Sequence, residues 1–129
     1  MYRHILIPTD GSELAQRGLA HGLVLAKSLG AKVSVIFVVE PLSEMTGRLQ
    51  EAVARYAELR KEQAAGALDH AATRAKEAGV PCETLQAENG QPHQAIIAAA
   101  EEKGCDLIVM SSHGRSGLSM LLILSLIHI

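Results

Sequence analysis

The sequence predicts an α/β fold in which an open parallel sheet is wound by helices on both faces. Short apolar runs typical of buried strands alternate with longer stretches of helical periodicity along the 129 residues. The composition is 48% hydrophobic, but the aromatic residues are only Tyr2, Phe37 and Tyr56. The core must therefore be aliphatic, as is usual for parallel sheets covered by alanine-rich helices. Two of the strand-like runs also end in polar loops that contain glycine.

The first half of the chain contains the patterns of two strands and one helix. Residues 4–7 are almost continuously apolar, which indicates a central strand covered on both faces, and Pro8 ends the run. A helix is predicted from Ser12, a favourable N-cap, to Gly30, a favourable C-cap. Residues 32–39 are rich in valine and predict the second strand.

The second half continues the alternation. A helix is predicted over about 48–78, and the weaker alternating run at 81–87 suits a strand at the sheet edge. Pro92 is well placed in the first turn of a third helix, which Gly104 ends. A fourth strand is expected at 106–110, followed by a loop and the start of another helix. We therefore expect a parallel sheet with right-handed crossovers.

Composition and charge exclude several classes of function. The length fits one domain, residues 1–129. The formal charge is −2 and the 12 basic residues are spread along the chain, so nucleic acid is not an expected partner. The apolar run 118–129 is well short of the ~20 residues that span a membrane. Two cysteines without a CxxC motif, and no apparent signal peptide, favour a reduced, cytoplasmic setting.

Two polar loops follow predicted strands and indicate a binding site for a nucleotide-sized anion. They are residues 8–12 and residues 111–117. In an open parallel sheet, ligands collect at the carboxyl ends of the strands, and the N–H groups at a following helix N-terminus favour phosphate. The second loop has no GKS or GKT ending and is not a Walker A motif. The alternative is that its glycines only allow a tight turn.

Four segments together resemble the universal stress protein family. They are HILIPTDGS at 4–12, VSVIFVVEP at 33–41, ENGQPHQAI at 88–96 and DLIVMSSHGRSGLS at 106–119. The resemblance implies a Rossmann-like fold of the adenine nucleotide α hydrolase-like type with five parallel strands, and a homodimer. It also implies a role in stress response, with ATP as the ligand and Mg²⁺ or Mn²⁺ as an accompanying ion.

The resemblance also implies a set of ATP-binding residues. ATP-binding members carry Gly-x-x-Gly followed nine residues later by Gly and then Ser or Thr. In this sequence those positions are Ser111, Gly114, Leu124 and Ser125. Leucine at the third position does not allow the close backbone approach that glycine does. The implied ATP-binding residues are Pro8, Thr9, Asp10, Val38, Ser111, Gly114, Arg115, Ser116, Gly117 and Ser125.

The resemblance implies that different residues of this set contact different parts of the nucleotide. Pro8, Thr9 and Val38 would contact the adenosine part, and Asp10 would contact the ribose or help to hold a metal ion that bridges phosphates. Residues 114–117 would bind the phosphates through N–H groups and a guanidinium. Two alternatives stay open: Asp10 as a helix cap, and Val38 as plain core. We predict no catalytic residue and no metal-ligand set, because His113 has no second ligand at a suitable spacing.

The C-terminal segment departs from the family pattern. Members normally continue through a helix and a fifth strand, whereas this sequence stops at Ile129. We therefore expect an incomplete domain that lacks the fifth strand and the usual dimer edge, with a foreign tail from about Leu124. Two other functions remain open: a nucleotide-free member that acts through protein contacts, and a truncated form without a ligand. An ATPase is disfavoured, and at most slow hydrolysis is expected.

Overall fold

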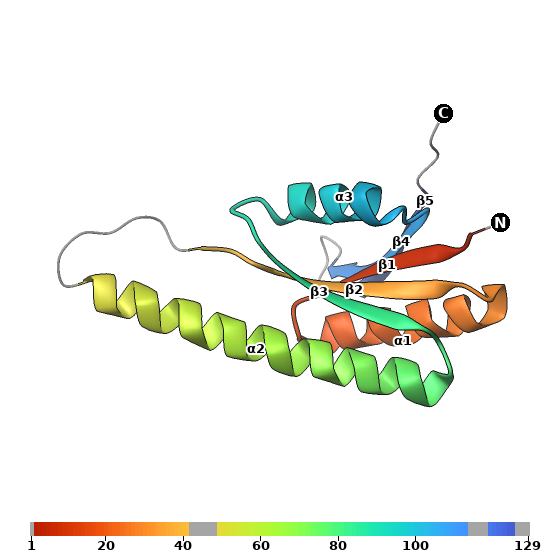
Figure 1. The fold of residues 1–129 in the computed structure, drawn as a ribbon, viewed down its shortest axis with the longest axis horizontal. Coiled ribbons are helices and arrows are strands. Elements are labelled where there is room, and N and C mark those ends of the chain that lie inside the picture. The colour runs from red at the N-terminus through yellow and green to blue at the C-terminus, as the bar shows by residue number, and fades with distance from the viewer. Residues whose placement is uncertain (1, 42–48, 114–118, 126–129) are drawn as a thin grey trace.

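A computed structural model describes residues 2–41, 49–113 and 119–125, with only the backbone described at Leu49 and from Ser112 onward. The strands are β1 (His4–Thr9), β2 (Lys32–Val39), β3 (Cys82–Glu88), β4 (Leu107–His113) and β5 (Ser119–Ser125). The helices are α1 (Glu13–Leu29), α2 (Leu49–Ala78) and α3 (Pro92–Lys103). The strands form one sheet in the order β3-β2-β1-β4-β5 (Figure 1).

The predicted parallel α/β architecture is confirmed for the first four strands. β1 pairs in parallel with β2 and with β4, and β2 pairs in parallel with β3. The caps also lie where the sequence predicts them. The Ser12 hydroxyl accepts a hydrogen bond from the backbone N–H of Ala15, and Gly30 ends α1 in the left-handed conformation with φ of 66°. Local capping chemistry therefore sets both ends of α1.

The segment after β4 differs from the prediction. The sequence predicts a loop from Ser111 and then a helix, but β4 continues to His113 and residues 119–125 form the antiparallel strand β5. The apolar run 120–124 has no polar positions at helical spacing, so it has no solvated face to present as a helix. An antiparallel neighbour needs only a short connection, whereas a parallel one needs a long crossover. The outer edge of β4 is thereby paired.

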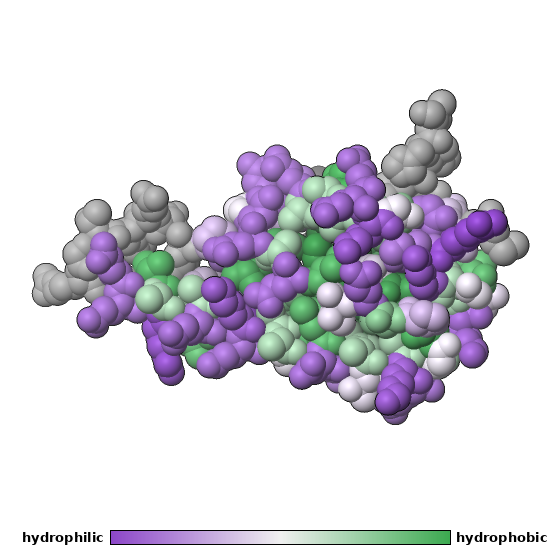
Figure 2. Space-filling view, viewed as in Figure 1, coloured by the Kyte–Doolittle hydropathy of each residue, from purple (hydrophilic) through white to green (hydrophobic). Residues whose placement is uncertain are grey.

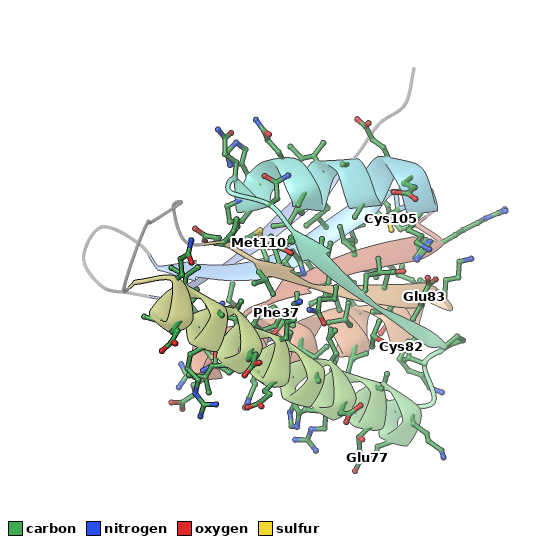
Figure 3. All side chains as sticks on the ribbon, turned by 60° about the vertical axis from the view of Figure 1, so that its left-hand side comes forward. Phe37, Glu77, Cys82, Glu83, Cys105 and Met110 are labelled. Atoms are coloured by element: carbon green, nitrogen blue, oxygen red, sulfur yellow. The ribbon has the colours of Figure 1, made fainter. Side chains whose placement is uncertain are left out.

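The two faces of the sheet bury separate aliphatic cores. Helices α1 and α2 cover one face and α3 covers the other (Figure 1). Because strand side chains alternate between faces, Ile5 and Ile7 of β1 join the core under α1 and α2, while Leu6 joins the core under α3. Figure 3 shows Phe37 on the α2 side of the sheet, and Cys105 and Met110 on the α3 side. This double burial explains why residues 5–7 are continuously apolar.

Helix α2 is long and its outer side is solvated. Two ion pairs with a separation of three residues lie along it, Arg55 with Glu58 and Arg74 with Glu77, both at 3.8 Å and both exposed. Hydrophilic residues accordingly follow α2 in the space-filling view (Figure 2). Among the described residues, no helix combines the length and the hydrophobicity that crossing a membrane requires.

A buried polar pair lies between β1 and β2 on the α3 side. The His4 Nε2 and Ser34 Oγ atoms are 2.7 Å apart, and the two residues are 6% and 0% exposed. Burial lowers the pKa of His4, and the positive charge of Lys32 lowers it further. The imidazole is therefore held neutral in a place where its charged form is poorly solvated.

We expect this histidine to make stability depend on pH. The unfolded chain gains a proton near the ordinary histidine pKa of about 6.5, whereas the folded state resists protonation until a lower pH. The free energy of unfolding should therefore be highest above pH 6.5 and should fall as the pH decreases toward the pKa of folded His4. Urea titrations at pH 7.5 and 5.5 check this.

The variant His4→Gln identifies the residue responsible. Glutamine can still form a hydrogen bond with Ser34, but it does not titrate. The loss of stability between pH 7.5 and 5.5 should be smaller in this variant than in the wild type. An equal loss in both proteins would show that His4 is not the group responsible.

Candidate functional site

The loop between β1 and α1 is held in one shape by its own side chains. The Thr9 hydroxyl accepts a hydrogen bond from the Gly11 N–H at 3.1 Å, and the Asp10 carboxylate accepts one from the Ser12 N–H at 2.9 Å. Gly11 has a φ of 80°, a conformation that favours glycine. Ser12, not Asp10, is the N-cap residue of α1. The Asp10 carboxylate therefore belongs to the loop and faces the end of the sheet.

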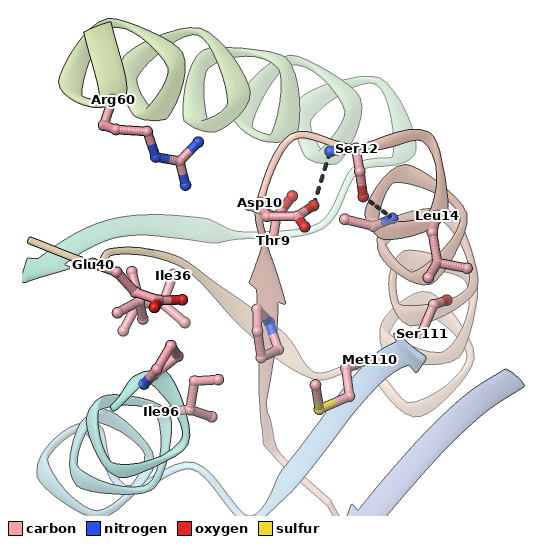
Figure 4. Close-up of a pocket in the computed structure, with 14 residues that line it drawn as sticks. Thr9, Asp10, Ser12, Leu14, Ile36, Glu40, Arg60, Ile96, Met110 and Ser111 are labelled. Carbon is pink, nitrogen blue, oxygen red and sulfur yellow. Dashed lines mark hydrogen bonds between the residues drawn. The ribbon is translucent and has the colours of Figure 1, made fainter. Parts of the chain in front are cut away.

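A cleft of about 310 Å³ lies at the carboxyl ends of β1, β2 and β4 (Figure 4). It brings together five of the predicted residues, which are Pro8, Thr9, Asp10, Val38 and Ser111. They come from β1, the loop after it, β2 and β4, and the strand order places the ends of these strands side by side. The cleft volume is at the lower end of the range usual for small-molecule sites.

The remaining predicted residues divide into two groups. Gly114, Arg115, Ser116 and Gly117 lie outside the described residues. Ser125 is described, and its position corrects the prediction. It pairs with Leu107, the first residue of β4, which itself pairs with Ile5 near the start of β1. Because β5 runs back along β4, Ser125 lies at the opposite end of the sheet from Thr9 and the cleft.

Several residues that line the cleft are not among the ATP-binding residues that the resemblance implies, although Ser12 belongs to the predicted loop 8–12. They are Ser12, Leu14, Ala15, Ile36, Glu40, Arg60, Pro92, Ile96 and Met110. Glu40 directly follows β2, and Met110 is the last residue of the strand predicted at 106–110, although β4 itself continues to His113. The rule that ligands collect at the carboxyl ends of strands could therefore have found both residues. Arg60 gives no such signal, because it lies in the interior of the 30-residue helix α2.

Charge in the cleft is carried by Asp10, Glu40 and Arg60. Burial favours the neutral form of Asp10, but hydrogen bonds from Ser12 and the charge of Arg60 outweigh it and hold the pKa of this carboxyl below its usual range. Asp10 is therefore an anion at neutral pH. A carboxylate offers about four lone-pair sites on its two oxygens, so Asp10 can also accept hydrogen bonds from a ligand hydroxyl or contact a hydrated cation.

The rest of the lining is largely apolar. Ile36 of β2, Ile96 of α3 and Met110 of β4 form the wall on the α3 side (Figure 4), and Val38 of β2 packs in the same core cluster. Such a surface suits a flat, apolar ring. Within the described part of the chain, no three His, Cys, Asp or Glu side chains are grouped as metal ligands.

Comparison with known proteins places this architecture in a family. The profile of the Universal stress protein family matches residues 1–128. Universal stress protein MJ0531 of Methanocaldococcus jannaschii is 37% identical over 124 residues, which are 95% of this chain and 72% of that protein.

Solved structures agree with the sequence comparisons. A universal stress protein family member from Burkholderia pseudomallei superposes with a TM-score of 0.72 at 28% identity, over 87% of this chain and 83% of that one. A universal stress protein in complex with cAMP superposes with a TM-score of 0.64 at 26% identity, over 84% of this chain and 75% of that one. The match to the profile and the similarity in both sequence and fold show that this chain belongs to the universal stress protein family.

Proposed function

We propose that this protein is a nucleotide-binding module of the stress-response type, with ATP as its ligand in the cleft at the ends of β1, β2 and β4. The observation that carries the proposal is the convergence of Pro8, Thr9, Asp10, Val38 and Ser111 on this one cleft. The similar universal stress protein that was solved in complex with cAMP supports an adenine nucleotide as the ligand class.

The proposed orientation follows the chemistry of the lining. The adenine ring lies against Ile36 and Val38, whose apolar side chains can cover its faces. The ribose hydroxyls donate hydrogen bonds to the Asp10 carboxylate, which is ionised at neutral pH. The phosphates lie toward Ser111 and residues 114–117, where the sequence combines glycines, a serine and an arginine.

The same lining favours binding without rapid hydrolysis. Among the described residues, those that line the cleft include neither lysine nor histidine, and Arg60 lies at its nucleoside side. Phosphoryl transfer enzymes use positioned cations and a group that orients the attacking water. We therefore propose that phosphate release from ATP is slow or nil.

Thermal unfolding with and without Mg-ATP tests the proposed function. A ligand that binds only the native state stabilises it by about 2.7 kcal/mol at 100 times its dissociation constant. We expect the midpoint to rise with ATP concentration in the wild type. No shift at millimolar ATP would contradict the proposal and would leave the nucleotide-free role through protein contacts.

The variant Asp10→Asn tests the role of the carboxylate. An amide oxygen can still accept the Ser12 N–H, but the negative charge is lost, and hydrogen bonds to charged groups contribute roughly 1.5–3 kcal/mol. The ATP-induced shift should therefore shrink in this variant. Asp69→Asn, at an exposed position on α2, is the matched control and should leave the shift unchanged. If the ATP-induced shift in Asp10→Asn equals that of the wild type, the proposed contact between Asp10 and the ribose is refuted, whereas ATP binding itself is not.

A further inference from the structure

The guanidinium of Arg60 is anchored at the cleft without forming an ion pair. Its central carbon lies 5.2 Å from the centroid of the Phe37 ring, a cation–π distance. Its Nη1 donates a hydrogen bond to Gln63 Oε1 at 2.6 Å. Within the described residues, no carboxylate lies within ion-pair distance of Arg60. Arg60 is thus fixed by a ring and a neutral amide, and its charge is not matched by direct contact.

Hydrogen bonds within the described protein do not satisfy every donor of Arg60. Its Nε is buried and has no hydrogen-bond partner there. Guanidinium groups carry five N–H donors in a rigid fork, and buried donors are normally satisfied. The structure therefore holds a cation with spare donors at the rim of a cleft, which is an arrangement suited to a ligand that supplies acceptor atoms.

Arg60 lies at the β2 end of the cleft. In Figure 4 its side chain extends from α2 toward the space between Glu40 and Asp10, while Ser111 and Met110 lie on the other side of Asp10. The sheet order separates β2 from β4 by the whole width of β1. The phosphate loop predicted at 114–117 continues from β4. Arg60 therefore lines the β2 side of the cleft, which is the side where the proposed function puts the nucleoside.

We propose that Arg60 is a specificity-determining residue that contacts the nucleoside part of the bound nucleotide by donating hydrogen bonds to acceptor atoms of the base or ribose. This inference rests on the proposed function. It adds a contact from α2, on the sheet face opposite the wall made by Val38 and Ile96, so that the nucleoside is held from both faces of the sheet edge. The charge of Arg60 also favours the ionised form of Asp10, the proposed ribose acceptor.

Adenosine and ATP distinguish a nucleoside contact from a phosphate contact. Dissociation constants for both are measured by NMR titration on the wild type and on Arg60→Gln. If Arg60 contacts the nucleoside, the variant should lose affinity for adenosine and for ATP by the same factor, about tenfold or more for a lost charge-assisted hydrogen bond. Arg60→Lys keeps the positive charge but not the planar set of guanidinium N–H donors, so this variant should lose affinity for both ligands as well.

A matched control is available on the same helix. Arg55→Gln removes an exposed arginine that pairs with Glu58 outside the cleft, and it should bind both ligands as the wild type does. The thermal midpoints of the variants without ligand show whether they are folded. The affinity comparison is made at a temperature where all of them are native.

Several outcomes would overturn the inference, and they differ from failure of the proposed function. A loss of ATP affinity with unchanged adenosine affinity would place Arg60 on the phosphates. Equal binding of both ligands by Arg60→Gln and the wild type would show that Arg60 makes no contact. Wild-type protein that binds ATP but not adenosine would also overturn it. If the wild type binds neither ligand, the proposed function itself fails.

Discussion

Replacing Phe37 with alanine is expected to lower the free energy of unfolding by about 3–5 kcal/mol. Phe37 has no exposed surface and is among the largest fully buried side chains of the described residues. It fills the space between β2 and α2 in a core whose other buried members are aliphatic. Truncation removes the buried ring and leaves a cavity, because the neighbouring backbone elements relax only in part.

Urea denaturation of Phe37→Ala measures this loss, and Leu59→Ala is its matched control. Leu59 lies on α2 but is 42% exposed, so its truncation should change stability by less than about 0.5 kcal/mol. A loss below about 1 kcal/mol for Phe37→Ala would mean that the space between β2 and α2 is not tightly packed around the ring.

The part of the fold set by local chemistry could be predicted from the sequence. Ser12 and Gly30 cap α1 as their residue types indicate. The strand β2 coincides with the predicted run 32–39, and β1 extends the predicted run 4–7 to Thr9. The strand β5 could not be predicted in this way. A run such as 120–124 that is apolar at every position carries no period, and only the availability of the β4 edge selects a strand.

The candidate site likewise contains residues that the sequence predicts and residues that only the packing of the chain brings to it. Asp10 and Ser111 lie in or next to polar segments that follow apolar runs, and the rule for parallel sheets predicts that they converge. Arg60 is one of many charged residues on α2, and the sequence does not say which of them faces the sheet edge. That depends on the packing of α2 against β2 and on the Phe37 ring that supports the guanidinium.

Replacing Gly22 with valine is expected to destabilise the protein by about 1–3 kcal/mol or more, through overpacking. α1 approaches the sheet so closely at this point that a Cβ atom on Gly22 would lie 2.5 Å from Ile7 Cδ1 and 3.6 Å from Val109 Cγ1. Ile7 and Val109 are fully buried. Because protein interiors are close-packed, either the Ile7 side chain must repack or α1 must shift away from β1 and β4, and both cost stability.

Gly66 provides the matched control on another helix. A Cβ atom at Gly66 would meet nothing within 4 Å, and the residue lies inside α2. Gly66→Val should therefore be neutral or slightly stabilising, because valine has a somewhat higher helix propensity than glycine. Urea titrations of both variants check the contrast. Equal losses at the two positions would argue against close approach of α1 as the cause.

A double-mutant cycle tests the contact itself. Ile7→Val removes Cδ1, the atom closest to the new Cβ, and alone should cost about 0.5–1.5 kcal/mol. If the contact between residues 7 and 22 causes the strain, Gly22→Ala should be better tolerated in the Ile7→Val background than in the wild type. The coupling free energy should then lie in the range of about 0.5–3 kcal/mol that contacting residues show. Additive losses would instead place the strain elsewhere along α1, for example at Gly18, where a Cβ atom would lie 2.9 Å from the Ser111 hydroxyl oxygen in the cleft.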